Sequence, residues 1–257
     1  MRMRQIALVA EKLDHATDLL EQVLGLEICH RDPGVGKWGL ENALLPIGHD
    51  FIEVVAPTQD NTTATRYLER RKGDGGYMVI LQCDDGVGER QRISDLGVRV
   101  AFFYDREPYH CTQYHPADVG GTLLEVDSMD NVTDHLSLDA SWGPAGDDWL
   151  PKVNTQITKR LIGVALQSTD PSAMADNWAR VLNTPLAQND EGGKQMIFND
   201  GTTVRFVQAQ DGRGDGLSEL DIVADVDAVL KAAQSRNLPI SGRQITLCGM
   251  RINLHEE

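Results

Sequence analysis

The spacing of hydrophobic residues along the chain predicts short strands that lead into amphipathic helices. Residues 5–8 and 163–166 have the mostly apolar character of a buried strand. In both places a stretch with apolar residues at helical intervals follows at the same distance, with Asp18 and Asp176 at equivalent positions. This equal spacing predicts an internal repeat.

Further apolar stretches follow the first of these helices and are separated by turn residues. They cover residues 26–29, 40–45 and 51–55, with turns rich in Pro, Gly and Asp between them. The repeated unit is therefore predicted to be β-α-β-β-β.

Two shorter copies of the unit are predicted after the longer ones. In one, residues 78–83 precede a helix and strands near 98–103 and 121–126; in the other, residues 220–223 precede a helix and strands at 244–247 and 250–254. Four units in an α+β fold indicate two domains. We expect them at residues 1–130 and 159–257, joined by an ordered, turn-rich linker at 131–158.

Composition narrows the functional classes. The chain has 257 residues, 24 Lys and Arg against 39 Asp and Glu, and a formal net charge of −15. This charge argues against nucleic-acid binding, which needs a basic surface. No apolar run is long enough to span a membrane or to serve as an export signal, and the four cysteines form no C-x-x-C motif. We therefore expect a cytoplasmic protein with free thiols and no membrane partner.

Several motifs resemble the vicinal oxygen chelate superfamily, which includes glyoxalase I, methylmalonyl-CoA epimerase, extradiol dioxygenases and bleomycin-sequestering proteins. They are VLGL at 23–26, LENA at 40–43, FIEVV at 51–55 and GGTLLE at 120–125. The resemblance implies tandem βαβββ modules, two of which close into a cup that holds a divalent metal ion.

In that superfamily the metal ligands lie on the first and last strands of each module. The matching positions here are Gln5, Glu53, Met78 and Glu125. Three of these residue types fit the glyoxalase I pattern, whereas a thioether is a soft and neutral ligand. The resemblance therefore implies a site of Gln5, Glu53 and Glu125 for Zn²⁺, Ni²⁺, Mn²⁺ or Mg²⁺, with Met78 lining the substrate cavity. The corresponding positions of the second domain hold no carboxylate or imidazole, so we expect that domain to be degenerate (Gly163, Phe206, Ser218 and Asn253).

Three more residues are predicted to contact the substrate. Trp38 and Asn42 flank a predicted strand of the first module, and His115 directly precedes the strand that carries Glu125. Two of them have a structural alternative: Trp38 suits the core, and a histidine before proline, such as His115, often fixes a turn. The glutamates, in turn, could alternate outward to solvent.

Two functions from different classes follow. The first is a glyoxalase-like lyase or isomerase that acts on a small oxygen-chelating metabolite through an enolate-type intermediate, with Glu53 or Glu125 moving the proton. Extradiol dioxygenation fits less well, because such iron sites use two histidines. The alternative is a metal-free protein that binds or sequesters a small molecule, like the bleomycin-resistance relatives. The oligomeric state, monomer or homodimer, stays open.

Overall fold

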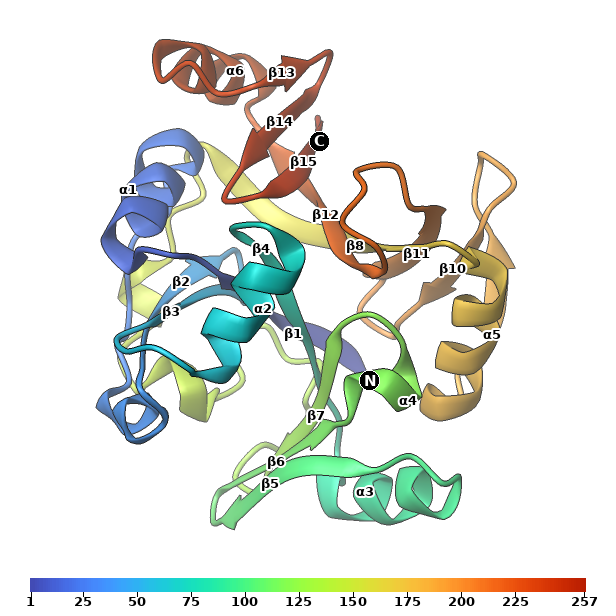
Figure 1. Cartoon of the computed structure of the whole chain (residues 1–257). Helices are drawn as coiled ribbons and strands as arrows, with labels where there is room; N and C mark the ends of the chain where they lie inside the picture. Colours follow the sequence, from blue (N-terminus) through green and yellow to red (C-terminus); the bar gives the residue numbers. More distant parts are fainter. The chain divides into compact units, whose positions relative to one another are not determined.

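The computed structural model describes residues 1–257 and contains two sheets, the first built from residues 2–129 (Figure 1). Its strand order is β2-β3-β1-β4-β7-β6-β5. The helices of this part are α1 (Leu13–Leu24), α2 (Thr63–Arg71), α3 (Gly86–Asp95) and the short α4 (Pro116–Val119), with a 3-10 helix η1 (Pro33–Trp38). The strands are β1 (Arg2–Val9), β2 (Leu40–Ile47), β3 (Asp50–Pro57), β4 (Gly75–Gln82), β5 (Val100–Arg106), β6 (Tyr109–Tyr114) and β7 (Leu123–Met129).

The second sheet is built from residues 158–255, in the order β13-β14-β15-β12-β8-β11-β10-β9. Its helices are α5 (Pro171–Leu182) and α6 (Val226–Ser235), and two 3-10 turns, η2 (Gly143–Ala145) and η3 (Leu150–Lys152), precede it. The predicted α+β class is confirmed. The strands are β8 (Thr158–Ser168), β9 (Leu186–Gln188), β10 (Lys194–Ile197), β11 (Thr203–Gln208), β12 (Gly216–Ala224), β13 (Ile240–Ser241), β14 (Gln244–Leu247) and β15 (Met250–His255).

Contacts divide the chain into two compact units, each of which takes segments from both halves of the sequence. Unit 1 comprises Met1–Ile6, Tyr77–Gly143 and Gly163–Leu217. Unit 2 comprises Ala7–Gly76, Pro144–Ile162 and Ser218–Glu257. The domain limits at residues 130 and 159 stay a prediction.

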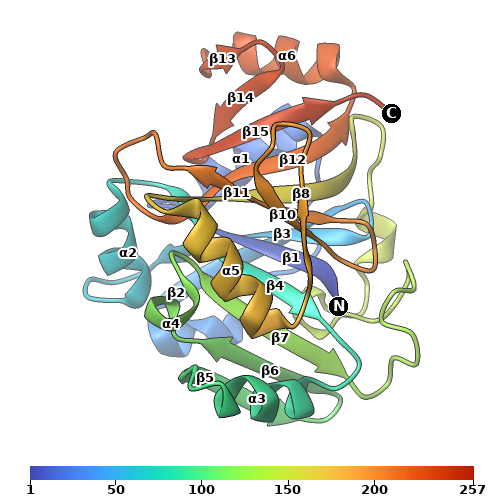
Figure 2. The same cartoon turned by 90° about the vertical axis from the view of Figure 1, so that its right-hand side faces the viewer.

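In unit 1, α3 lies against β6 and β7, and α4 lies beside α5 (Figure 2). The Arg92 guanidinium donates to the carbonyl oxygen of Val181 at 2.8 Å, and the Asn177 amide donates to those of Asp118 and Val119 at 2.8 Å. Side chains of the second and third modules thereby tie this unit together.

In unit 2, α1 lies beside α6, as Figure 1 also shows. Arg236 directly follows α6, and its guanidinium donates to the side-chain oxygen of Gln22 in α1 at 2.6 Å. Trp149, which is 2% exposed, packs edge-on against Phe51 with ring centroids 5.0 Å apart. The region of 131–158 thus contributes a large buried side chain to this core.

The structure differs from the predicted strands at residues 26–29, at β6 and at the two-residue strand β13. Residues 26–29 form no strand: His30 makes a single bridge with Leu44, and the chain then enters η1, whose Pro33 has no N–H to continue a ladder. Conversely, β6 was not predicted, because its polar residues give little apolar alternation.

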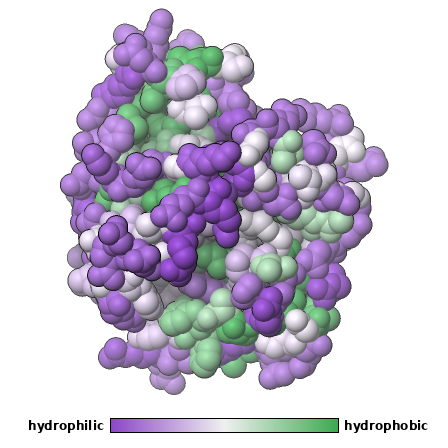
Figure 3. Space-filling view, in the orientation of Figure 1, coloured by the Kyte–Doolittle hydropathy of each residue, from purple (hydrophilic) through white to green (hydrophobic).

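The surface is mostly polar on the face that Figure 3 shows, where hydrophobic residues form smaller groups. No helix of the structure combines the length and hydrophobicity needed to cross a membrane.

The turn at Gly249, between β14 and β15, is predicted to tolerate no side chain. Gly249 has a positive φ of 69°, and a Cβ there would lie 1.8 Å from the backbone oxygen of Asp74. Gly242→Ala is the matched control, because its φ is 59° but a Cβ would have nothing within 4 Å. We expect Gly242→Ala to lower the free energy of unfolding by about 1–2 kcal/mol, and Gly249→Ala by roughly 3 kcal/mol or more. Equal losses in thermal or urea unfolding would contradict this close approach.

Candidate functional site

One face of β7 in unit 1 carries two acidic residues. Glu125 and Asp127 are two positions apart, so their side chains project from the same face of the strand. The antiparallel register of β6 with β7 places Gln113 opposite Glu125 and Cys111 opposite Asp127. Cross-strand partners share a face, so all four side chains lie together.

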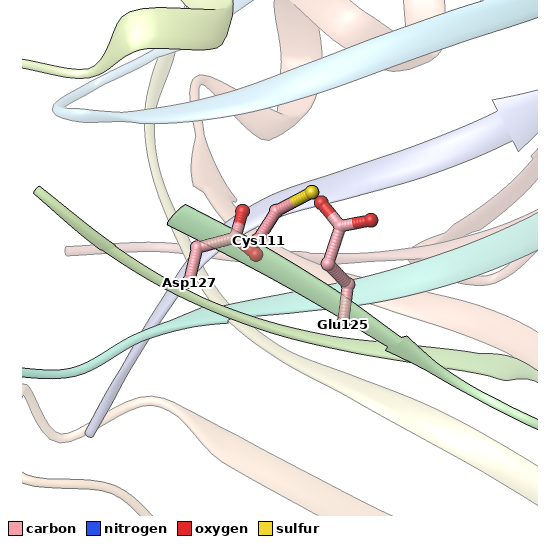
Figure 4. Close-up of side chains that lie close together, drawn as sticks. All are labelled: Cys111, Glu125 and Asp127. Carbon is pink, nitrogen blue, oxygen red and sulfur yellow. The ribbon is translucent and has the colours of Figure 1, made fainter. Parts of the chain in front are cut away.

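Cys111, Glu125 and Asp127 form a buried cluster (Figure 4). One thiol or carboxylate atom of each lies within 4.8 Å of the others. The Tyr109 hydroxyl donates to Oδ2 of Asp127 at 2.7 Å, whereas Oδ1 of Asp127 is buried without a hydrogen-bond partner. A buried carboxylate oxygen in this state calls for a proton, a water molecule or a cation.

Burial makes the charged forms of this cluster unfavourable. It raises the pKa of Glu125, although contacts with Asp127, Gln113 and Tyr109 oppose the shift. Burial and the nearby Glu125 charge raise the pKa of Asp127 well above its ordinary value. Burial, reinforced by both carboxylates, also raises the pKa of the Cys111 thiol. Burial therefore favours the protonated forms of the two carboxyl groups in the absence of a cation, and the upward shift of the pKa is larger for Asp127 than for Glu125.

A chain of contacts leads from this cluster to Gln5. The Trp142 indole N–H donates to Oε1 of Gln5 at 2.7 Å, and its ring meets the Tyr109 ring edge-on with centroids 6.0 Å apart. Trp142 is 1% exposed. Gln5 and Glu125, both expected in the site, thus belong to one network in unit 1, through a tryptophan that the prediction assigned to the linker.

Three other predicted site residues lie in unit 2. The Asn42 amide donates to Oε1 of Glu53 at 2.6 Å, and its oxygen accepts from the Asp32 backbone N–H at 2.8 Å. Asn42 and Glu53 are buried. Trp38 is 45% exposed, with the Lys37 ammonium 4.0 Å from its ring centroid, so the alternative of a core role for Trp38 is wrong.

His115 and Met78 belong to unit 1. His115 caps α4, because its Nδ1 accepts from the Ala117 backbone N–H at 3.2 Å. Met78 is 6% exposed and pairs with Leu123. The metal-ligand role of Gln5, Glu53 and Glu125, the catalytic role of Glu53 and Glu125, and the substrate role of Trp38, Asn42, Met78 and His115 stay predictions.

Sequence reasoning missed Tyr109, Cys111, Asp127 and Trp142. The predicted last strand ended at residue 126, one position before Asp127, whereas β7 extends to Met129. Continued alternation from Glu125 to Asp127 was the available signal. For Cys111 the sequence offered no comparable signal, because the polar residues of β6 hide the alternation of the strand.

The donor set fits a divalent cation. Two carboxylates balance the charge of such an ion, and the unpartnered Oδ1 of Asp127 offers it an oxygen. The Cys111 sulfur adds a softer donor of the kind that Zn²⁺ binds.

The raised pKa values predict how the metal-free protein responds to pH. A carboxyl whose pKa is higher in the folded state stabilises the fold below its unfolded pKa, and this contribution is lost as the pH rises through the folded value. In chelator-treated protein, we therefore expect Asp127→Asn to raise the melting temperature by roughly 3 °C or more at about pH 9, with a smaller gain at about pH 5. A gain that does not grow with pH would contradict the assignment.

Comparisons with known proteins agree with this fold. The family model described as "Glyoxalase-like domain" matches residues 6–182. The mitochondrial methylmalonyl-CoA epimerase of Mus musculus is 21% identical over 131 residues, which cover 49% of this chain and 72% of the epimerase.

Two solved structures resemble most of the chain. A mutant of 4-hydroxymandelate synthase from Streptomyces coelicolor has a TM-score of 0.66 and 17% identity, covering 92% of this chain and 75% of that chain. The Mn(II)-bound glyoxalase from Novosphingobium aromaticivorans has a TM-score of 0.63 and 12% identity, covering 98% of this chain and 80% of that chain. At these identities the similarity shows the fold alone. The family model spans most of the chain and confirms the resemblance to the vicinal oxygen chelate superfamily: this protein belongs to the glyoxalase-like domain family.

Proposed function

We propose that this protein is a metal-dependent enzyme, a lyase or isomerase that acts on a small oxygen-chelating metabolite. The observation that supports this most is the buried acid pair of unit 1, in which Asp127 keeps an oxygen without a partner. Structural acid pairs are usually neutralised within the protein, whereas functional sites often hold groups with strongly shifted pKa values.

Glu125, Asp127 and Cys111 are the residues that would hold the ion, and Gln5 and Glu53 remain proposed ligands from the superfamily pattern. A bound Zn²⁺, Ni²⁺, Mn²⁺ or Mg²⁺ would act as a Lewis acid that stabilises negative charge on substrate oxygens.

The chain's own residues supply orientation and proton transfer. The Asn42 amide donates to the Glu53 carboxylate at 2.6 Å and fixes its position. This supports a role of Glu53 as proton acceptor, because a proton acceptor must be held within hydrogen-bond reach of its substrate. The Tyr109 hydroxyl donates to Oδ2 of Asp127 at 2.7 Å. This hydrogen bond fixes the orientation of the carboxyl group and therefore the position of Oδ1. We propose Glu53 and Glu125 as the groups that move the substrate proton.

A metal-free binding protein is the second candidate. It is favoured by the indole N–H that already donates to Oε1 of Gln5, and by the burial that raises the pKa of Asp127 and so favours its neutral form. In that case Glu125 and Asp127 would be a polar part of a ligand cavity. An organic ligand would then raise the melting temperature without any metal ion.

Metal content distinguishes the two candidates. Protein purified without a chelating tag, stripped and then dialysed against each of the four ions, is expected to bind about one ion per chain. Glu125→Gln and Asp127→Asn are expected to weaken binding by about 10-fold or more. Asp221→Asn is the control, because Asp221 is another buried acid whose Oδ1 accepts from the Asn253 amide at 2.7 Å. Absence of binding to the wild type under saturating metal would contradict the enzyme proposal and leave the binding protein.

Glu53→Gln tests the superfamily ligand set separately. If Glu53 is a ligand, this variant loses affinity as Glu125→Gln does. Wild-type affinity in Glu53→Gln, measured by the same dialysis, would remove Glu53 from the ligands and leave its role in proton transfer to be tested.

A further inference from the structure

Gln82, at the end of β4, is a buried amide whose hydrogen-bonding capacity is unused. Its side chain is 0% exposed, and neither Nε2 nor Oε1 has a hydrogen-bond partner. Buried polar groups are nearly always paired, so an amide with both atoms unpaired indicates an interaction with a further group.

The sheet register places this amide beside the acid cluster. Asp127 of β7 has a partner on each side. In the parallel pairing with β4 its partner is Gln82, and in the antiparallel pairing with β6 its partner is Cys111. Gln82, Asp127 and Cys111 therefore form one row on the same face of three neighbouring strands. Oε1 of Gln82 and Oδ1 of Asp127 are therefore two acceptor oxygens in adjacent residues of this face, both buried without a hydrogen-bond partner.

The internal repeat supplies a comparison within unit 1. Gln167 occupies the corresponding position of β8, since each glutamine lies three residues before the N-cap of the next helix, Asp85 or Asp170. Gln167 is also 0% exposed, but its Nε2 donates to Asp211 at 2.6 Å and to the Gly214 oxygen at 2.8 Å. The module that begins with β8 thus pairs the amide of Gln167 with its own loop, whereas the module that begins with β4 leaves the amide of Gln82 unpaired.

We infer that Gln82 is a further ligand of the divalent cation, donating its amide oxygen beside Asp127, Glu125 and Cys111. This inference rests on the metal site proposed above. Charge supports it: two ionised carboxylates already balance a divalent ion, so a neutral oxygen donor adds coordination without adding charge. An ordered water molecule is the competing occupant.

The test combines metal affinity with the stability of the stripped protein. Gln82→Met keeps the volume and removes the amide; we expect its dissociation constants for Mn²⁺ and Zn²⁺, measured by calorimetry, to rise about 10–100-fold. In the stripped protein the same variant is expected to melt at the wild-type temperature or above, because it removes unpaired buried groups. Gln167→Met should do the reverse, with unchanged metal affinity and a lower melting temperature, because it breaks two hydrogen bonds.

Gln82→Glu retains an oxygen donor and is expected to bind metal at least as tightly as the wild type, whereas the melting temperature of the stripped Gln82→Met protein guards against a folding defect. Wild-type affinity in Gln82→Met together with a lower melting temperature would overturn the inference and indicate a water-filled site. If the wild type binds metal and Asp127→Asn does not, an unaffected Gln82→Met refutes the role of Gln82 alone. If the wild type binds no ion, the proposed function fails with it.

Discussion

The chemistry of unit 1 depends on how two carboxyl groups in its interior are neutralised. Glu125 is 5% exposed and Asp127 is 0% exposed, on one face of a strand whose other residues are mostly apolar. An ionised carboxylate is strongly disfavoured there unless a proton, a hydrogen-bond donor or a cation compensates it. Tyr109 supplies one donor to Asp127, and the other oxygen of that carboxyl group is buried without a hydrogen-bond partner.

Unit 2 shows how the same fold treats acids that need no ligand. Glu219 and Asp221 lie two positions apart on β12, in the manner of Glu125 and Asp127 on β7. There, Arg251 pairs with Glu219 at 2.9 Å and the Asn253 amide donates to Asp221 at 2.7 Å. In unit 1, by contrast, Asp127 accepts from the uncharged Tyr109 hydroxyl at 2.7 Å, and its Oδ1 has no hydrogen-bond partner. The contrast supports a ligand-binding role for the pair in unit 1 and a structural role for the pair in unit 2.

Local patterns were sufficient to predict much of the fold. The predicted strand at 244–247 coincides with β14, because its apolar residues alternate with polar ones and turn residues bound it on both sides. The strand at 26–29 failed since Pro33 and η1 end the pairing after one bridge, which no apolar count shows. In the site, the apolar surroundings of Glu125 revealed its burial. The contact of Trp142 with Gln5 joins residues 137 positions apart, so it depends on tertiary packing that local spacing does not encode.

The binding of a cation by Glu125 and Asp127 is tested most directly by the number of protons released when the stripped protein binds a divalent ion. Calorimetric titration in buffers of different ionisation enthalpy gives this number. Because burial raises the pKa of Asp127 and a metal ligand must be deprotonated, we predict release of about one proton per ion near neutral pH, lost in Asp127→Asn. Binding without proton release would show that the carboxyls were already ionised, and would contradict the account.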